Sequence, residues 1–299
     1  MDIDITDLRL FVEIAEAGNL TRGARRAYLT PPAASARIKA LEARLGAALL
    51  YRGNRGVSLT TAGARFLHHA RLILRQLDYL RDEFAAGGAA GGHLRVYANT
   101  TAVTEFLPEL LASFLADRPD ASVDVQERLT RDIFRGVRDG SADMGIVSGE
   151  VPGEGIEAIP FSTDRLVLAV PEGHPLTKCA RVSFAETLAH RHVGLHEGST
   201  LLAFLQGLME KSGYDRALRT QVRSFEAMCR MVETGVGIGV VPESAAMRHA
   251  RTMRLRFIEI AEPWALRTRS VVVRDRAALP RLARALIDEL VRTGAGGSK

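Results

Sequence analysis

Basic side chains gather in the first quarter of the chain, where their types and spacing suit contact with nucleic acid. From Leu8 to Arg75 there are twelve basic residues and three acidic ones, a net charge of +9, whereas the whole chain carries +5. The rest of the chain is therefore mildly acidic. Because this asymmetry concentrates an attractive field on one segment, it favours a polyanion as the partner of that segment, and double-stranded DNA in particular.

Several residues in this segment suit defined contacts with a duplex. Arg37 can donate to guanine O6 and N7 together, which is worth about 1–3 kcal/mol of discrimination, whereas Ala33 and Ala36 could contact only a thymine methyl. We therefore expect Arg37 to contact a base. The full set of expected DNA contacts is Arg25, Thr30, Pro32, Ala33, Ser35, Ala36, Arg37, Lys39, Arg52, Asn54 and Arg55.

The remaining polar residues of this set are expected at the backbone of the duplex. Phosphate contacts orient a protein on DNA without selecting a sequence. The alternative for any single arginine is a solvated surface charge, but their clustering on one motif favours the DNA role. We assign phosphates to Thr30, Ser35, Arg25 and Lys39, and backbone or minor-groove contacts to Arg52, Asn54 and Arg55.

Three short helices are expected to carry most of these side chains. The first ends near Gly18, and its apolar residues recur at i, i+3, i+4 and i+7. The second covers about 21–28 with Asn19 as its cap. The third begins at the cap Thr30, has proline in its first turn, and reaches about Leu45.

A hairpin and a long helix follow. Residues 49–52 and 57–59 flank a glycine- and asparagine-containing turn, which predicts two paired strands. Three helices and a hairpin make a winged helix-turn-helix over residues 1–60. Thr60 can cap a helix over 61–86, and its apolar stripe has no expected partner within so small a domain, which indicates a dimer interface. The stripe comprises Phe66, Leu67, Ile73, Leu74, Leu77 and Leu80.

The chain then changes character. Residues 87–92 contain four glycines and no side chain able to anchor a core, which indicates a hinge between two domains. Beyond it, strands and helices alternate in the rhythm of a parallel α/β sheet. The clearest strands are expected at 94–98, 122–127, 144–147, 166–170 and 192–195, with others at 237–241 and 270–274.

A polar run follows the first of these strands. Asn99, Thr100 and Thr101 precede a helix, so their side chains and the free backbone N–H groups can hold a small anion, and a carboxylate fits there. The alternative is ordinary helix capping, which needs no ligand.

The run from Leu8 to Ala27, the run from Pro32 to Glu42, and Leu59-Thr60-Thr61-Ala62-Gly63 together resemble the LysR-type transcriptional regulators. Phe106-Leu107-Pro108, residues 140–146 and residues 235–242 resemble the regulatory domain of the same family. The family often has glutamine at the positions of Pro31 and Arg37, so we expect the bases contacted here to differ.

This resemblance implies a two-lobed second domain similar to type 2 periplasmic solute-binding proteins. The effector-binding domain then covers 93–299, with one lobe at about 93–163 and 267–299 and the other at about 164–266. The resemblance adds Thr130, Ser199, Thr200 and Phe225 to the effector residues Asn99, Thr100 and Thr101. It also implies a homotetramer built from two dimers that binds an interrupted palindrome. The expected function is sequence-specific regulation of transcription, modulated by a small effector.

Composition limits the other classes. Hydrophobic residues at 46% and charged residues at 25% are ordinary for a globular protein, and no apolar run approaches the roughly 20 residues that a membrane span needs. The acidic start is unlike a signal peptide, so we expect a cytoplasmic protein without membrane contact. Cys179 and Cys229 lack metal-site spacing and are expected to be reduced and mostly buried.

The alternative function is a small-molecule-binding or enzymatic α/β protein with an accessory nucleic-acid-binding module. Residues 235–239 invite a dinucleotide-binding interpretation, but the expected order of helix, glycines and strand is the reverse of that motif. His190, His192 and His196 have no acidic or thiol partner at metal-binding spacing, and Ser199 lacks a nucleophile elbow. We therefore expect no catalysis, cofactor or metal.

Overall fold

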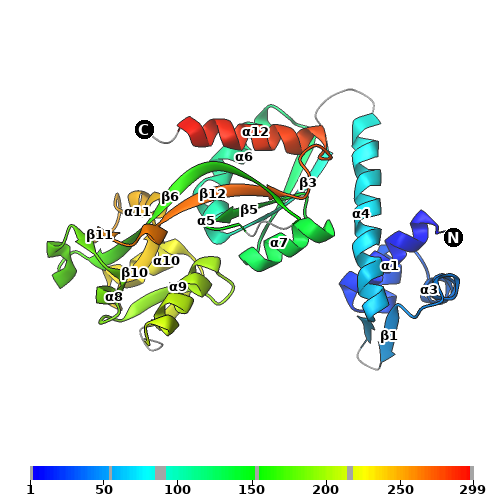
Figure 1. Ribbon diagram of the computed structural model, residues 1–299, viewed down its shortest axis with the longest axis horizontal. Helices are drawn as coiled ribbons and strands as arrows, with labels where there is room; N and C mark the ends of the chain where they lie inside the picture. The colour runs from blue at the N-terminus through cyan, green and yellow to red at the C-terminus, as the bar shows by residue number, and fades with distance from the viewer. Residues whose placement is uncertain (1–2, 54–55, 85–91, 152–154, 214–217, 297–299) are drawn as a thin grey trace. The chain divides into compact units, whose positions relative to one another are not determined.

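The structure is a computed structural model that describes residues 3–53, 56–84, 92–151, 155–213 and 218–296 (Figure 1). The chain divides into two compact units, one formed mainly by residues 1–88 and one mainly by residues 89–299. The expected hinge at 87–92 lies outside the described residues except for Gly92.

The first unit has the expected order of three helices, a hairpin and a long helix. Asn19 accepts a hydrogen bond from the Arg22 amide at 2.9 Å and so begins the second helix, and Thr30 caps the third in the same way. Its elements are α1 (Ile5–Ala17), α2 (Leu20–Arg26), α3 (Pro31–Leu45), β1 (Leu50–Gly53), β2 (Gly56–Leu59) and α4 (Thr61–Phe84).

The helices of this unit pack closely around one small core. Gly23 of α2 lies so near α1 that an added Cβ would sit 2.4 Å from the Ile14 Cα, so only glycine fits this crossing. The carboxylate of the partly buried Glu42 accepts hydrogen bonds from the Leu49 and Leu50 amides and thereby fixes the start of the wing to α3. The core contains Leu10, Phe11, Ile14, Ala34, Ile38, Leu41 and Leu67.

The stripe on α4 differs from its prediction at its N-terminal end. Leu67 is 9% exposed and Phe66 packs edge-to-face on Phe11 with 5.0 Å between ring centroids, so both residues belong to the core of their own unit. The expectation that the whole stripe lacks a partner in the unit is therefore wrong for these two residues. Further along α4, Ile73 is 48% exposed and Leu80 is 53% exposed.

The second unit is organised by a mixed sheet in the order β4-β3-β5-β12-β6-β11-β7, with β10 also paired to β6. The first three strands of this order are parallel, and β12 runs antiparallel to both β5 and β6. The strands of the first lobe are β3 (Gly92–Ala98), β4 (Ala121–Glu127), β5 (Met144–Ser148), β6 (Glu157–Pro171) and β12 (Leu266–Val273).

Helices cover both faces of the first lobe. Val271 and Val273 point into one core with α6 and α12, whereas Val272 points into the other with α7, as alternation along a strand requires. Figure 1 shows α12 lying along the sheet beside α6. The helices are α5 (Thr100–Glu105), α6 (Leu107–Ala116), α7 (Thr130–Asp139) and α12 (Arg281–Gly296).

The second lobe is built around the C-terminal half of β6. That half pairs with two antiparallel strands, and a separate parallel pair lies beside it. The additional strands are β7 (Arg181–Val182), β8 (His192–Leu195), β9 (Leu218–Val222), β10 (Gly239–Pro242) and β11 (Leu255–Ile260). The helices are η1 (Pro175–Lys178), α8 (Phe184–Thr187), α9 (Thr200–Lys211), α10 (Phe225–Glu233), α11 (Glu243–His249) and η2 (Pro263–Ala265).

Strand β6 therefore runs through both lobes. Residues 157–165 pair with β12 and residues 166–171 pair with β10 and β11. The fold class predicted from the sequence, a winged helix-turn-helix with a long helix followed by a two-lobed α/β domain, is confirmed. The strand predicted at 166–170 is only the end of β6, because the polar first half of β6 lacks a continuous apolar run.

Two further expectations were tested by the structure. Cys229 is buried, but Cys179 is exposed at the end of η1, so the expected burial is wrong for that thiol. Among the described helices, none is both long and apolar enough to cross a membrane.

Candidate DNA interface and effector site

Helix α3 presents one narrow face to solvent. Its buried side is formed by Ala34, Ile38 and Leu41, which pack into the core of the first unit. The residues at intervening positions are free of that packing. Exposed on α3 are Pro32, Ala33, Ala36, Lys39, Ala40, Ala43 and Arg44. Apart from Lys39 and Arg44, the exposed side chains are small and apolar, which suits close approach of the helix backbone to base edges.

Arg37 is held at the side of this face by carboxylates of α1 and its cap. Its Nε donates to Asp7 Oδ1 at 2.7 Å and its Nη2 donates to Asp4 Oδ2 at 2.8 Å. Asp7 is buried and also accepts from Arg44. The hydrogen bonds from the Thr6 amide and from Arg37 hold the pKa of Asp4 below its usual range, and the bond to Asp4 raises the pKa of Arg37.

The expected phosphate contacts lie around the N-terminus of α3. Thr30 is exposed, and its Oγ1 accepts from the Ala33 amide at 3.4 Å, which leaves the hydroxyl hydrogen able to donate to a phosphate. Arg52 of the wing donates to Ser35 Oγ at 3.0 Å and lies 3.8 Å from Glu42, so the wing is tied to α3.

Two other expected contacts carry exposed charges. Arg25 near the end of α2 and Lys39 of α3 are exposed, and within the described part of the chain neither has a carboxylate partner. Asn54 and Arg55 lie outside the described residues. Of the expected basic contacts in the described residues, Arg25 and Lys39 are thus unpaired cations, whereas Arg37 and Arg52 are bonded to neighbouring groups.

The expected effector residues Asn99 and Thr100 of the first lobe are hydrogen-bonded to neighbouring groups at the ends of its strands. Asn99 Oδ1 accepts from the Ala102 amide at 2.9 Å as the cap of α5, and its Nδ2 donates to Ser148 Oγ at 3.1 Å. Thr100 Oγ1 donates to Glu127 Oε1 at 2.6 Å, so its hydrogen is already engaged. Both Asn99 and Thr100 are buried, whereas Thr101 is half-buried on α5.

The two lobes meet through a polar contact between two of the expected residues. Thr200 Oγ1 at the start of α9 accepts from the Thr130 amide at 3.1 Å and lies 3.3 Å from the Thr130 Oγ1. His196 Nε2 lies 3.9 Å from Glu127 Oε1. We call Asn99, Thr100, Glu127, Thr130, Ser148, His196 and Thr200 the interlobe cluster.

Ser199 and Phe225 have structural roles. Ser199 is fully buried and its Oγ caps α9 by accepting from the Leu202 amide. Phe225 is 2% exposed and belongs to the hydrophobic core of the second lobe. Because neither side chain is presented at a surface of the interlobe cluster, their assignment as effector contacts rests on the resemblance alone.

Arg267 also lies in this region, although no sequence motif indicated it. From the start of β12 it donates to the Ser148 carbonyl in the first lobe, and its guanidinium lies 5.1 Å from the centroid of the Phe204 ring in the second. Burial lowers the pKa of this arginine. Phe204 is one helical turn after Thr200 on α9, so Arg267 and the Thr130–Thr200 contact lie along the same face of that helix.

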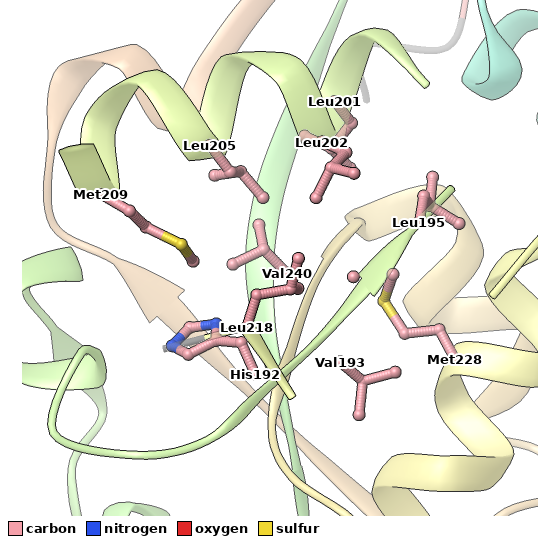
Figure 2. A pocket seen from close by; sticks show the side chains of 11 residues that line it. His192, Val193, Leu195, Leu201, Leu202, Leu205, Met209, Leu218, Met228 and Val240 are labelled. Atoms are coloured by element: carbon pink, nitrogen blue, oxygen red, sulfur yellow. The ribbon is translucent and has the colours of Figure 1, made fainter. Parts of the chain in front are cut away.

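Two cavities lie elsewhere in the second unit. Figure 2 shows the first, which has about 10 Å³ of space among Leu201, Leu205, Met228 and His192 in the second lobe. A water needs at least about this much space together with polar partners, so this is a packing void. The second, of about 550 Å³, lies within the first lobe between α6, β6 and α12.

The three histidines considered as metal ligands do not form a metal site. His192 is buried, its Nε2 lies 3.0 Å from the Thr187 carbonyl oxygen, and burial lowers its pKa to about 4. Within the described residues, no group of three or more histidine, cysteine or carboxylate side chains is placed to hold a metal. The glycines after α10 precede β10, so the order is helix, glycines, strand, as the sequence predicts.

Comparison with family models covers both units. Residues 5–64 match a model described as "Bacterial regulatory helix-turn-helix protein, lysR family", and residues 87–295 match one described as "LysR substrate binding domain". The chain therefore belongs to the LysR family of bacterial regulators.

Similar proteins agree with this assignment. The chain is 30% identical over 267 residues to the uncharacterized HTH-type transcriptional regulator YnfL of Escherichia coli, covering 88% of this chain and 89% of the relative. It is 28% identical over 282 residues to a probable RuBisCO transcriptional regulator of Porphyra purpurea, covering 90% and 87% of the two chains.

Solved structures resemble the whole chain. A full-length OxyR variant from Pseudomonas aeruginosa superposes with a TM-score of 0.75 at 25% identity, covering 97% of this chain and 95% of that one. CbnR in complex with its target DNA superposes with a TM-score of 0.63 at 26% identity, covering 97% and 100%. The protein is thus a LysR-type DNA-binding transcription regulator with an effector-binding domain, and the enzymatic alternative is not favoured.

Proposed function

We propose that a small acid bound at the interlobe cluster changes how paired winged helices of this regulator sit on DNA. The hydrogen bonds between Thr130 and Thr200 carry the proposal, because they join the two lobes through polar groups to which a bound ligand would itself form hydrogen bonds. A ligand shifts the arrangement of the lobes only if it binds one arrangement better than another. Replacement of these bonds by ligand contacts supplies that difference.

The chemical class of the effector follows from Arg267. A desolvated guanidinium that is bonded to a carbonyl oxygen and packed on an aromatic ring retains donors suited to a carboxylate. Glu127 lies nearby on the Thr100 side of the cluster and favours a donor group at that end. We therefore propose a small carboxylate with a hydroxyl or amine substituent. The effector contacts proposed are Asn99, Thr100, Thr101, Thr130, Thr200 and Arg267.

We further propose that the protein works as a homodimer through α4, and as a homotetramer of two such dimers. The exposed residues Ile73 and Leu80 support the dimer, because large apolar side chains about two helical turns apart on one helix face favour a helix partner. The expected domain limits of 1–60, 61–86, 87–92 and 93–299 are proposed with it. The tetramer follows from the family resemblance.

Thermal unfolding of the full chain with a panel of small carboxylates tests the effector proposal. Each acid is paired with its neutral amide, and the panel covers aliphatic hydroxy acids, amino acids and aromatic acids. We expect at least one acid to raise the midpoint by several degrees and its amide to have no effect, since mass action stabilises the bound state. Equal shifts for acid and amide, or no shift from any acid, would contradict it.

A further inference from the structure

Tyr28 combines an unfavourable backbone conformation with an exposed aromatic ring. Its φ is +56°, and it is the one residue other than glycine with positive φ in the described part of the chain. Its exposed fraction is 96%, the highest among the large exposed hydrophobic residues of the described chain. The ring therefore contributes almost nothing to the core of the first unit.

The backbone position explains why a smaller residue would serve the fold better. The Tyr28 amide donates to the Arg25 carbonyl at 3.1 Å and the Leu29 amide donates to the Ala24 carbonyl at 2.8 Å, which closes α2. The left-handed residue that closes a helix in this way is usually glycine, sometimes asparagine, because other side chains are strained there. Tyrosine at this position thus has two unfavourable features, its positive φ and its exposed ring. The stability of the fold therefore does not explain why a tyrosine stands here.

The place of Tyr28 indicates what it does instead. It lies in the turn between α2 and α3, two residues before Thr30, the cap of α3, and three residues after the exposed Arg25. In helix-turn-helix proteins the first helix of the motif crosses the DNA backbone while the N-terminus of the second contacts base edges. The turn between these two helices is therefore expected to lie beside the sugar-phosphate backbone.

We propose that Tyr28 is a DNA-backbone contact, with its hydroxyl donating to a phosphate oxygen and its ring lying against a deoxyribose. Tyrosine is one of the side chains that make such contacts, and they position a protein without selecting a sequence. The positive φ allows the hydrogen bonds that end α2, and it directs the side chain of Tyr28 away from the core of the unit. The contact adds to those of Thr30 and Arg25 on the same turn and its flanks.

Binding of the full chain to a random 30-base-pair duplex pool tests the proposal, with fluorescence anisotropy at two salt concentrations and thermal unfolding of each variant. Tyr28→Phe removes the hydroxyl alone, and Tyr28→Asn removes the ring while keeping a residue that tolerates positive φ. A net hydrogen bond corresponds to a loss of about three- to tenfold, so we expect about threefold weaker binding for Tyr28→Phe and about tenfold for Tyr28→Asn. Both variants should unfold at or above the wild-type temperature.

Two results would overturn the proposal. One is binding by both variants within the error of the wild type at both salt concentrations; the other is a loss of thermal stability in Tyr28→Asn while Tyr28→Phe binds DNA normally. Weaker binding by stable Tyr28→Phe supports the contact even if Tyr28→Asn is destabilised. Absence of duplex binding by the wild type would instead contradict the regulator function itself, so the two failures are distinct.

Discussion

The Nε atom of Arg37 lies 2.7 Å from Oδ1 of the buried Asp7, so the arginine expected to contact a base is held by α1. Asp4 binds the same guanidinium from the cap of α1. Five N–H groups are available on a guanidinium, and these bonds use two of them. Arg37 can therefore contact a guanine only with its remaining donors in a fixed orientation, or by releasing Asp4.

The first prediction concerns this arrangement. Arg37→Ala should lose discrimination between specific and random DNA, because a bidentate arginine–guanine pair contributes about 1–3 kcal/mol. Competition binding with an operator and a scrambled duplex measures it. If Arg37→Ala weakens binding to both duplexes equally, Arg37 does not contact a base and serves only to join α3 to α1.

Asp7→Asn tests how much the ion pairs of Asp7 with Arg37 and Arg44 contribute to the stability of the first unit. It leaves two arginines without their shared carboxylate, and a hydrogen bond to a charged group contributes about 1.5–3 kcal/mol. Since both guanidinium groups are partly exposed, we expect a loss near the lower end, measured by urea unfolding. Unchanged stability would show that water replaces the carboxylate at no cost.

The second prediction concerns the unpaired cation on α3. Lys39→Ala should weaken binding to all sequences and reduce the salt dependence by about one ion, because a phosphate contact releases about one counterion. Lys178→Ala, an exposed lysine of the second unit, is the control and should leave both quantities unchanged. The same salt slope for Lys39→Ala as for the wild type would remove Lys39 from the interface.

The third prediction tests the effector contacts. Thr200→Val and Arg267→Gln should abolish the thermal shift caused by an active acid while DNA binding in its absence stays normal. Arg256→Gln replaces an exposed arginine that pairs with Glu172 and is the control. If an acid shifts the midpoints of Thr200→Val and Arg267→Gln as much as that of the wild type, it binds elsewhere.

The fourth prediction concerns pH. His192 has a pKa of about 4 in the fold because burial disfavours its charged form, against an ordinary value of 6.5. The unfolded chain therefore binds more protons than the folded chain between these pH values. The contribution of neutral His192 to the free energy of unfolding is complete above pH 6.5 and is lost as the pH is lowered toward 4. The loss is up to about 3 kcal/mol. His192→Gln should show a smaller loss in urea unfolding between pH 7 and 5, and an equal loss would assign it to other groups.

The fifth prediction concerns assembly. Leu80→Glu should weaken the dimer, because it places a charge on the exposed apolar stripe of α4. Met247→Glu is the control, as Met247 is 62% exposed on the second unit. Light scattering coupled to size exclusion gives the mass of each. A Leu80→Glu protein with the wild-type mass would exclude this part of α4 as the essential contact.

The first unit was largely predictable from sequence because its signals are local. Asn19 and Thr30 are capping residues, glycines end α1 and α3, and helical spacing marks each buried face. The tie between Arg37 and Asp7 was not predictable, since it joins residues 30 positions apart and no local pattern states which arginine faces which carboxylate.

The second unit was predictable in class but not in its central strand. Only the apolar end of β6 has a clear pattern, while its first half is defined by pairing with β12, about 100 residues later. Arg267 was missed for the same reason, because its neighbours Ser148 and Phe204 come from distant segments. Ser199 and Phe225 were assigned from the resemblance alone, and in the structure the first caps α9 and the second lies in the core of the second lobe.

The most direct test is selection of genomic DNA by the intact protein at two salt concentrations, with sequencing of the bound fragments and the Arg37→Ala variant in parallel. We expect enrichment of a dyad by the wild type, and loss of that enrichment by Arg37→Ala while its binding to bulk DNA persists. No enriched sequence for the wild type at either salt would contradict sequence-specific regulation through this winged helix.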